Sequence, residues 1–208
     1  MNKKPGRPTG EATRKRIVAA ALQTLKTEGF SGTTSRAIAR AGGFNQALIF
    51  YHFGTLDGVL LAALDKTSEE RLSRYREAVA KAETATELAE VAARIYREDR
   101  DLGHMTVVSQ MIAGSVARPG LAREVLARME PWIELCEEAL TKALSGLPVS
   151  QAMPLRELAY ALTTFYLGLN LVTHLDEDRE RTEALVARLQ GLAPVLFSAP
   201  PPTRMAAR

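Results

Sequence analysis

Apolar residues recur along the first part of this chain with the period of an α-helix. Within residues 12–28, Ile17, Ala21 and Leu25 are spaced four apart, which places them on one face of a helix. The stretch EGFSGTT that follows contains two glycines and interrupts this period. We therefore expect one amphipathic helix here, ended by a turn.

Two shorter helices are expected next, over residues 35–40 and 45–52, because glycine-containing segments separate them. Thr34 stands directly before the first of them and has a side chain that can cap a helix N-terminus. Thr55 occupies the same position before a long helix, which we expect to continue past Arg71.

Helical periodicity continues through the remaining residues, and no segment alternates with period two for long enough to predict a strand. Breaks in the pattern fall near residues 82–86, 99–103, 118–120, 146–154 and 175–179. The sequence thus predicts an all-α protein with four or five further helices. Residues 199–208 are expected to form a disordered tail.

Residues 158–175 could be mistaken for a membrane helix, because eighteen residues without a formal charge approach the shortest length that spans a bilayer. However, the segment contains three threonines, an asparagine and a histidine, and charged residues flank both ends. We expect a helix buried in a bundle and no association with a membrane.

The charge is unevenly distributed, although the net charge of the 208 residues is only +3. Residues 1–56 contain nine Lys or Arg and two Glu, a net charge of +7, so the remaining residues carry −4. A basic first quarter on a mildly acidic body favours binding to a polyanion. A solvated basic surface is the alternative interpretation.

Cysteine content and the N-terminus indicate the compartment. Cys136 is the single cysteine, so no disulfide can form within the chain, and a reducing compartment is expected. The first sixteen residues lack the apolar segment of a secretion signal. We therefore expect a cytoplasmic protein.

Two short helices joined by a glycine turn, after a longer helix, form a helix-turn-helix pattern. The second short helix of such a motif enters the major groove of DNA with its N-terminus first. Its first turn contains Asn45, Gln46 and Ala47. Asn and Gln can form two hydrogen bonds with adenine, and Ala can contact a thymine methyl group, so these residues are candidates for reading bases.

The aromatic residues of this segment divide between two roles. Four of the 12 aromatic residues of the chain lie within residues 42–53, a window without formal charge. Phe44 and Phe53 are spaced from Ile49 so that all three can face inward and pack on Ile17, Leu25 and Ile38. The other aromatic residues lie near the end of the helix, where a recognition helix passes the sugar-phosphate backbone.

The segment TTSRAIARAGGFNQALIFYHFGTLDGVL resembles the DNA-binding segment of the tetracycline-repressor (TetR) family, through its Thr-Thr entry, Ile-Ala pair, Ala-Gly turn and Tyr-His-Phe ending. The resemblance covers about residues 11–71. It implies a three-helix N-terminal helix-turn-helix head on a larger C-terminal helical body, residues 72–198, for ligand binding and dimerisation.

The resemblance also implies function. Such a protein is a homodimer that binds a palindromic double-stranded DNA operator, most often as a repressor, and a small-molecule effector releases it. The DNA-contact positions of the family correspond here to Thr34, Ser35, Arg36, Asn45, Gln46, Phe50, Tyr51 and His52. The alternatives are a solvated helix residue for Arg36 and a local packing role for His52.

Two residues depart from the family pattern. Phe50 stands where many members have a tyrosine, so it lacks the hydroxyl that would bind a phosphate. Leu56 stands where the family usually has a lysine, so a common phosphate contact is in doubt. Residues 1–10 are expected to form a flexible basic arm, in which Arg7 lies in a Gly-Arg-Pro sequence that resembles minor-groove hooks. A disordered tail that only aids solubility is the alternative for this arm.

The helix over residues 155–175 has two neighbouring apolar stripes, so it must bury more than one side. One stripe, which can face its own domain, consists of Leu158, Leu162, Phe165, Leu169 and Val172. The other, which can face a partner chain, contains Ala161, Thr164, Gly168 and Leu171. With Leu185 and Leu189 of the last helix, it predicts a four-helix interface between two chains, because a monomer would leave a large apolar patch in water.

Candidates for binding a small effector lie on or near apolar faces of the middle helices, and they are Met105, Gln110, Met111, Trp132, Cys136 and Tyr166. Polarisable and aromatic residues with a few polar groups suit a small-molecule pocket, and they suit a plain core equally well.

The sequence bears on two other classes of function. An enzyme is not expected, because the three histidines are far apart and no phosphate-binding loop or nucleophile motif is present. No metal and no cofactor are expected. A helical protein-interaction module without sequence-specific DNA binding would account for the apolar helices but not for the basic head.

Overall fold

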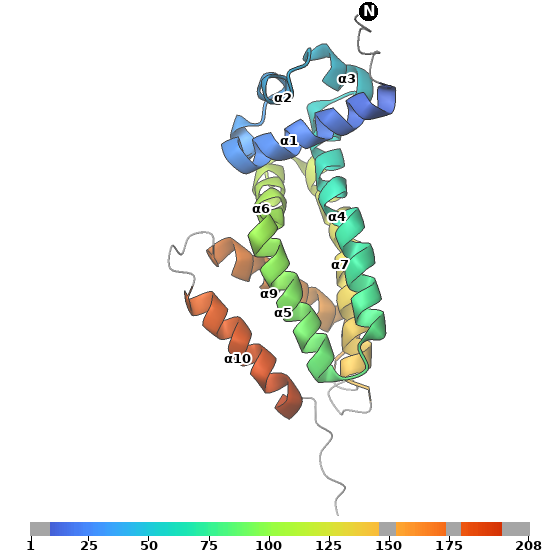
Figure 1. Cartoon of the computed structure of the whole chain (residues 1–208), viewed down its shortest axis with the longest axis vertical. Helices are drawn as coiled ribbons and strands as arrows, with labels where there is room; N and C mark the ends of the chain where they lie inside the picture. The colour runs from blue at the N-terminus through green and yellow to red at the C-terminus, as the bar shows by residue number, and fades with distance from the viewer. Residues whose placement is uncertain (1–8, 146–152, 174–179, 197–208) are drawn as a thin grey trace, which may run out of the picture. The chain divides into compact units, whose positions relative to one another are not determined.

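A computed structural model describes residues 9–145, 153–173 and 180–196, and every regular element in these ranges is an α-helix (Figure 1). The all-α prediction is therefore confirmed for this part of the chain. The helices are α1 (Gly10–Gly32), α2 (Ser35–Gly42), α3 (Ala47–Phe53), α4 (Leu56–Lys81), α5 (Ala85–Leu102), α6 (His104–Ser115), α7 (Pro119–Ala143), α9 (Leu155–Thr173) and α10 (Glu180–Leu196).

Two compact units make up the chain. The first contains the residues up to Arg71 together with Leu102–Glu130, and the second contains Leu72–Asp101 and the residues from Pro131 onward. The helix α7 changes unit at Pro131, which has no N–H to donate within the helix. The predicted domain limits, 11–71 and 72–198, stay a prediction. The compact units differ from them because residues 102–130 belong with the head.

Local signals set the ends of the short helices, as the sequence predicted. The hydroxyl of Thr34 accepts a hydrogen bond from the Ala37 N–H at 3.1 Å and caps α2, which ends at Gly43 with a φ of 62°. The hydroxyl of Thr55 accepts from the Gly58 N–H at 3.0 Å and caps α4. Both predicted caps are confirmed, and they fix where α2 and α4 begin.

The core of the first unit confirms the predicted inward face of the head. Ile17, Ile38 and Ile49 are fully buried in one apolar cluster. Phe44 and Phe53 are half-buried and pack against that cluster, so they face inward as expected. The cluster anchors α3 by one side and leaves its opposite side at the surface.

The helix α6 contributes to this same core and to the end of α1. Met111 is fully buried in the head cluster. The backbone turns at Gly29, whose φ is 69°, and the next residue, Phe30, donates its N–H to Gln110 Oε1 at 2.8 Å. The ring of Phe30 lies against Gly114, where an added Cβ would be 2.1 Å from the ring Cγ. Thus α1 and α6 are joined by a hydrogen bond and by close packing.

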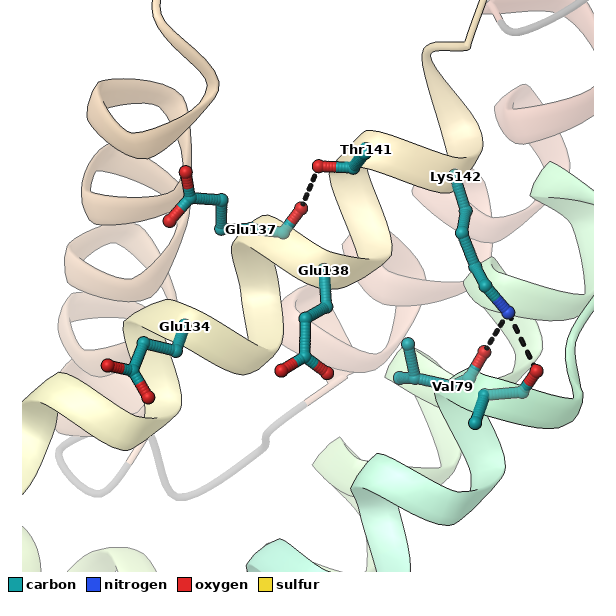
Figure 2. A pocket seen from close by; sticks show the side chains of 7 residues that line it. Val79, Glu134, Glu137, Glu138, Thr141 and Lys142 are labelled. Carbon is teal, nitrogen blue, oxygen red and sulfur yellow. Dashed lines mark hydrogen bonds between the residues drawn. The ribbon is translucent and has the colours of Figure 1, made fainter.

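In the second unit, Tyr75 is fully buried, and its ring lies 6.1 Å from that of Trp132. The ammonium group of Lys142 on α7 caps the C-terminal end of α4 (Figure 2). It donates to the carbonyls of Val79 and Ala80 at 2.9 and 2.7 Å. It also donates to the carbonyl of Ala82 at 3.1 Å. A cation is favourable at this position, because the last carbonyls of a helix lack partners within the helix and carry partial negative charge.

Residues 158–173 of the uncharged segment form most of α9, which the sequence predicts to be buried. That expectation is wrong for the single chain, because the buried residues of the helix are Ala159, Asn170 and Thr173. The stripe expected to face its own domain is largely exposed, at Leu162, Phe165 and Val172. Within the described residues, no single helix is long and apolar enough to cross a membrane. Only α3 and α4 taken together meet these two criteria, and these helices are bent by 70° relative to each other.

Candidate nucleic-acid interface

The exposed side of α3 presents aromatic residues at its C-terminal half. Phe50 and Tyr51 are 44% and 82% exposed, whereas the neighbouring Ile49 is fully buried. His52 is half-buried, and its ring meets that of Tyr51 edge to face at a centroid distance of 5.0 Å. The structure therefore brings the three predicted contact residues together at the surface, with His52 held against Tyr51.

The predicted base-reading residues lie at the start of α3, where Asn45 and Gln46 precede the helix and Ala47 is its first residue. Asn45 and Ala47 are exposed, and Gln46 is half-buried. The side-chain oxygen of Asn45 accepts a hydrogen bond from the Ala47 N–H at 2.8 Å. A two-bond contact with adenine needs that acceptor as well as the amide donor, so the predicted adenine contact of Asn45 does not fit this conformation. Gln46 makes no capping hydrogen bond through its side chain, so its amide oxygen and its NH2 group are both available to a base.

The N-terminus of α2 gathers the other predicted contacts. Thr34 and Arg36 are exposed, and Ser35 is half-buried. The hydroxyl oxygen of Thr34 already accepts the capping bond, so it is the hydroxyl proton that remains for a phosphate oxygen. Free N–H groups and the helix dipole favour an anion at such a terminus.

Ion pairs reduce the charge of several basic residues in the head. Arg40 pairs with Glu28 at 3.3 Å. Lys15 pairs with Glu11 at 2.8 Å, and this hydrogen bond holds the pKa of Glu11 below its usual value. Arg36 makes no ion pair with any described residue, so its charge is not neutralised by that part of the chain. This favours the predicted DNA contact of Arg36 over a role in internal pairing.

Two arginines of α1 bind backbone carbonyls, one before α3 and the other in its last turn. Arg16 donates to the carbonyls of Gly42 and Gly43 at 3.0 and 2.7 Å, through Nε and Nη2. Arg14 donates from Nη1 to the His52 carbonyl at 3.2 Å, and its Cζ lies 4.4 Å from the ring centroid of Phe53. The sequence indicated only that both residues add to the basic charge, because neither spacing nor composition reveals a contact so distant along the chain.

Comparison with known proteins agrees with this geometry. Residues 17–63 match the family described as bacterial regulatory proteins, tetR family. Residues 17–63 therefore form a TetR-family DNA-binding domain. TetR-family regulators are non-enzymatic transcription factors, in agreement with the expectation that this chain is not an enzyme.

Solved structures share the fold of this chain. A putative TetR-family transcriptional regulator from Rhodococcus sp. is 21% identical, with a TM-score of 0.72 and coverage of 89% of this chain and 98% of that one. FadR from Bacillus subtilis, in complex with stearoyl-CoA, is 14% identical, with a TM-score of 0.70 and coverage of 86% and 96%. NalD, the secondary repressor of the MexAB-OprM multidrug efflux pump in Pseudomonas aeruginosa, is 20% identical, with a TM-score of 0.65 and coverage of 90% and 96%. No curated protein matches the sequence.

The six predicted effector-binding residues of this regulator fall in two different units. Met105, Gln110 and Met111 belong to the first unit, where Met111 is core and Gln110 binds the end of α1. The other three belong to the second unit and have separate partners. There, Trp132 packs against Tyr75, Tyr166 donates to Asp99 Oδ2 at 2.6 Å, and burial raises the pKa of the Cys136 thiol.

A groove of about 580 Å³ in the second unit contains none of these six residues. Its lining is Val79, Ala80, Glu134, Glu137, Glu138, Thr141 and Lys142, as Figure 2 shows. Arg76 lies 3.2 Å from Glu138, and Arg156 lies 3.0 Å from Glu137, so cations of the chain already neutralise part of its acidic lining. In the described ranges, no three His, Cys, Asp or Glu side chains are grouped to hold a metal ion.

The six residues predicted for the dimer interface are all exposed in the single chain, and they are Ala161, Thr164, Gly168, Leu171, Leu185 and Leu189. Further large apolar residues of α9 and α10 are exposed beside them, namely Tyr160, Leu162, Phe165, Val172 and Leu192. Their contact with a partner chain stays a prediction. Arg7 of the predicted arm lies outside the described residues.

Proposed function

We propose that this TetR-family regulator acts in the cytoplasm as a homodimeric repressor that binds a palindromic operator and is released by a small-molecule effector. The observation that carries the DNA-binding part is the exposed side of α3. A head that buries Ile49 but leaves Tyr51 82% exposed has a surface suited to contact with another molecule. The free charge of Arg36 at the start of α2 favours a polyanion as that molecule.

The exposed apolar residues of α9 and α10 support the homodimer. Phe165, Leu171 and Val172 are each more than half exposed in the single chain. Soluble proteins rarely leave so many neighbouring apolar side chains in water, so a second copy of the chain is the expected cover. A dimer with two-fold symmetry presents two copies of α3, and an operator with matching symmetry would be a palindrome.

Control by an effector is supported by the fold and by the connection between α6 and the head. FadR from Bacillus subtilis has this fold in complex with stearoyl-CoA. In this chain, α6 binds the end of α1 through Gln110 and packs on it through Gly114. Movement of α6 on effector binding would therefore reach the head directly. NalD, a repressor of similar fold, supports repression as the direction of control.

The experiment is selection of duplexes from a random-sequence DNA pool, followed by a gel shift at two salt concentrations. We expect an enriched inverted repeat with half-sites about one helical turn apart or somewhat more. Affinity should fall steeply as salt rises, because each phosphate contact releases counterions. Enrichment of no sequence, or binding that ignores salt, would refute the proposal in favour of a protein-interaction module.

A further inference from the structure

We propose that Arg14 and Arg16 are positioning residues for DNA recognition, which bind backbone carbonyls before α3 and in its last turn and fix the angle at which α3 meets DNA. This inference rests on the proposed function. Both side chains are exposed and basic, so by composition alone they would be counted as phosphate contacts. Their hydrogen bonds assign them a different role.

Arg16 holds the turn that precedes α3. Its guanidinium donates two hydrogen bonds, to the carbonyls of Gly42 at 3.0 Å and Gly43 at 2.7 Å. Carbonyls at the end of a helix carry partial negative charge and lack partners within the helix, so a planar cation that donates twice suits them well. A lysine could not reproduce this contact, because it is a point charge without the fork.

The same turn is also fixed by packing. The ring of Phe44 lies over Gly42, where an added Cβ would be 2.1 Å from Cε1, and the guanidinium of Arg16 lies 5.6 Å from the centroid of that ring. Gly43 has a φ of 62°, a conformation that residues with a Cβ rarely adopt. Because Asn45 and Gln46 follow directly, any shift of this turn changes where they meet the bases.

Arg14 holds the other end of α3. It donates to the His52 carbonyl at 3.2 Å, and its guanidinium lies over the ring of Phe53 at 4.4 Å. Gly10, one turn earlier on α1, lies beside the imidazole, with the position of its absent Cβ 4.0 Å from His52 Cε1. Thus α1 contacts the chain before α3 and at its end, and α3 cannot tilt without breaking one of these contacts.

The test compares selective and non-selective DNA affinity. The probes are a duplex enriched by the parent chain from a random pool and a scrambled duplex of the same composition. The variants are Arg16→Lys, Arg16→Gln and Arg14→Gln, in the full chain at a temperature where all are folded. Lys15→Gln is the matched control, because it removes a charge between the two arginines whose described partner is the exposed Glu11.

A positioning role predicts loss of selectivity in both Arg16 variants, whether or not the charge is kept. Affinity for the enriched duplex should fall about 10- to 100-fold, the usual range for loss of one or two hydrogen bonds to a charged group. Arg14→Gln should lose selectivity in the same direction, and Lys15→Gln should retain it. For Arg16→Lys, affinity for the scrambled duplex should stay within about twofold and the salt slope should be unchanged, because the positive charge at residue 16 is conserved.

A second readout needs no DNA. Hydrogen exchange of the backbone amides over residues 42–53 should accelerate in the arginine variants, while the core amides of α1 keep their protection. If exchange accelerated throughout the first unit, the arginines would stabilise the whole unit and not the position of α3. That result would overturn the positioning role. Full selectivity in Arg16→Lys, together with a weaker salt slope and loss of affinity for both duplexes in Arg16→Gln, would make Arg16 a phosphate contact and overturn it as well. If the parent enriches no duplex, the proposed function is refuted and this inference with it.

Discussion

Replacement of Gly168 by arginine should separate the proposed dimer without disturbing the fold of the chain. Gly168 lies on the exposed apolar side of α9, and nothing lies within 4 Å of the position that a Cβ would take. A larger side chain therefore meets no other atom of the same chain. Glycine is a poor helix former, so the substitution should not lower the stability of α9 itself. Any loss of association then reports on the partner chain.

The expected size of the effect follows from the burial of a charge. Leaving one charge unpaired in a dry interface costs about 3–5 kcal/mol. Two-fold symmetry would place two such charges in the same seam, whereas the long side chain of arginine can carry its charge partly to the rim. We therefore expect Gly168→Arg to weaken the free energy of dimerisation by at least about 3 kcal/mol, which corresponds to an increase in the Kd of the dimer of roughly 10²-fold.

Sedimentation of Gly168→Arg and of a control, Gly120→Arg, measures this difference. Gly120 is also an exposed helical glycine with nothing within 4 Å of its Cβ position, but it lies at the start of α7 in the first unit. The control should sediment as the parent does, and melting curves should show both variants folded. An undisturbed dimer of Gly168→Arg would place this glycine outside the interface. Dissociation of both variants would point to added positive charge rather than to the seam.

Three further predictions concern the head and its contact with α6. Gln46→Ala should relax preference at one base pair, at a cost of about 1–3 kcal/mol there, whereas His52→Ala should weaken binding to all duplexes about equally; base-by-base binding profiles identical to that of the parent would contradict the placement of α3. Leu56→Lys should lower the Tm, because Leu56 packs against the head core and a cation at the N-terminus of α4 costs about 0.3–1 kcal/mol. A salt slope steeper by about 0.9 for each new phosphate contact would show that the lysine also reaches DNA. Gly114→Ala should destabilise the chain by about 1–3 kcal/mol in thermal melting, because its Cβ would lie 2.1 Å from the ring of Phe30; an unchanged Tm would mean that the ring moves aside freely.

The parts of the head that could be predicted from sequence depend on neighbouring residues. Thr34 caps the residue three positions later, and Gly43 ends α2 through its own φ. The inward direction of Ile17 and Ile49 follows from the helical period, because a helix has only one side toward a given core. Such features need no knowledge of the tertiary arrangement, and the structure confirms them.

The features that sequence reasoning missed depend on contacts between distant residues. Arg16 binds carbonyls 26 and 27 residues away, and the amide of Phe30 meets Gln110 at a separation of 80 residues. Asn45 illustrates a different limit, because its side chain could either cap α3 or read a base. Nothing in the sequence decides between these two uses, whereas the position of the Ala47 N–H does.

The helices α9 and α10 show why an apolar pattern alone does not identify the inner side of a helix. The last helix binds its own chain through polar groups, since the hydroxyls of Thr173 and Thr182 are 3.0 Å apart and Arg100 lies 2.7 Å from Glu183. Leu185, Leu189 and Leu192 of the same helix are each more than a third exposed, with Leu189 at 44%. In a monomer this arrangement would be unfavourable, because burial of the leucines would be the larger gain. The arrangement becomes favourable if a second copy of the chain covers these leucines. The polar side of α10 then binds its own chain, and the apolar side is buried against the partner chain. The polar inner side and apolar outer side of α10 thus favour the proposed dimer.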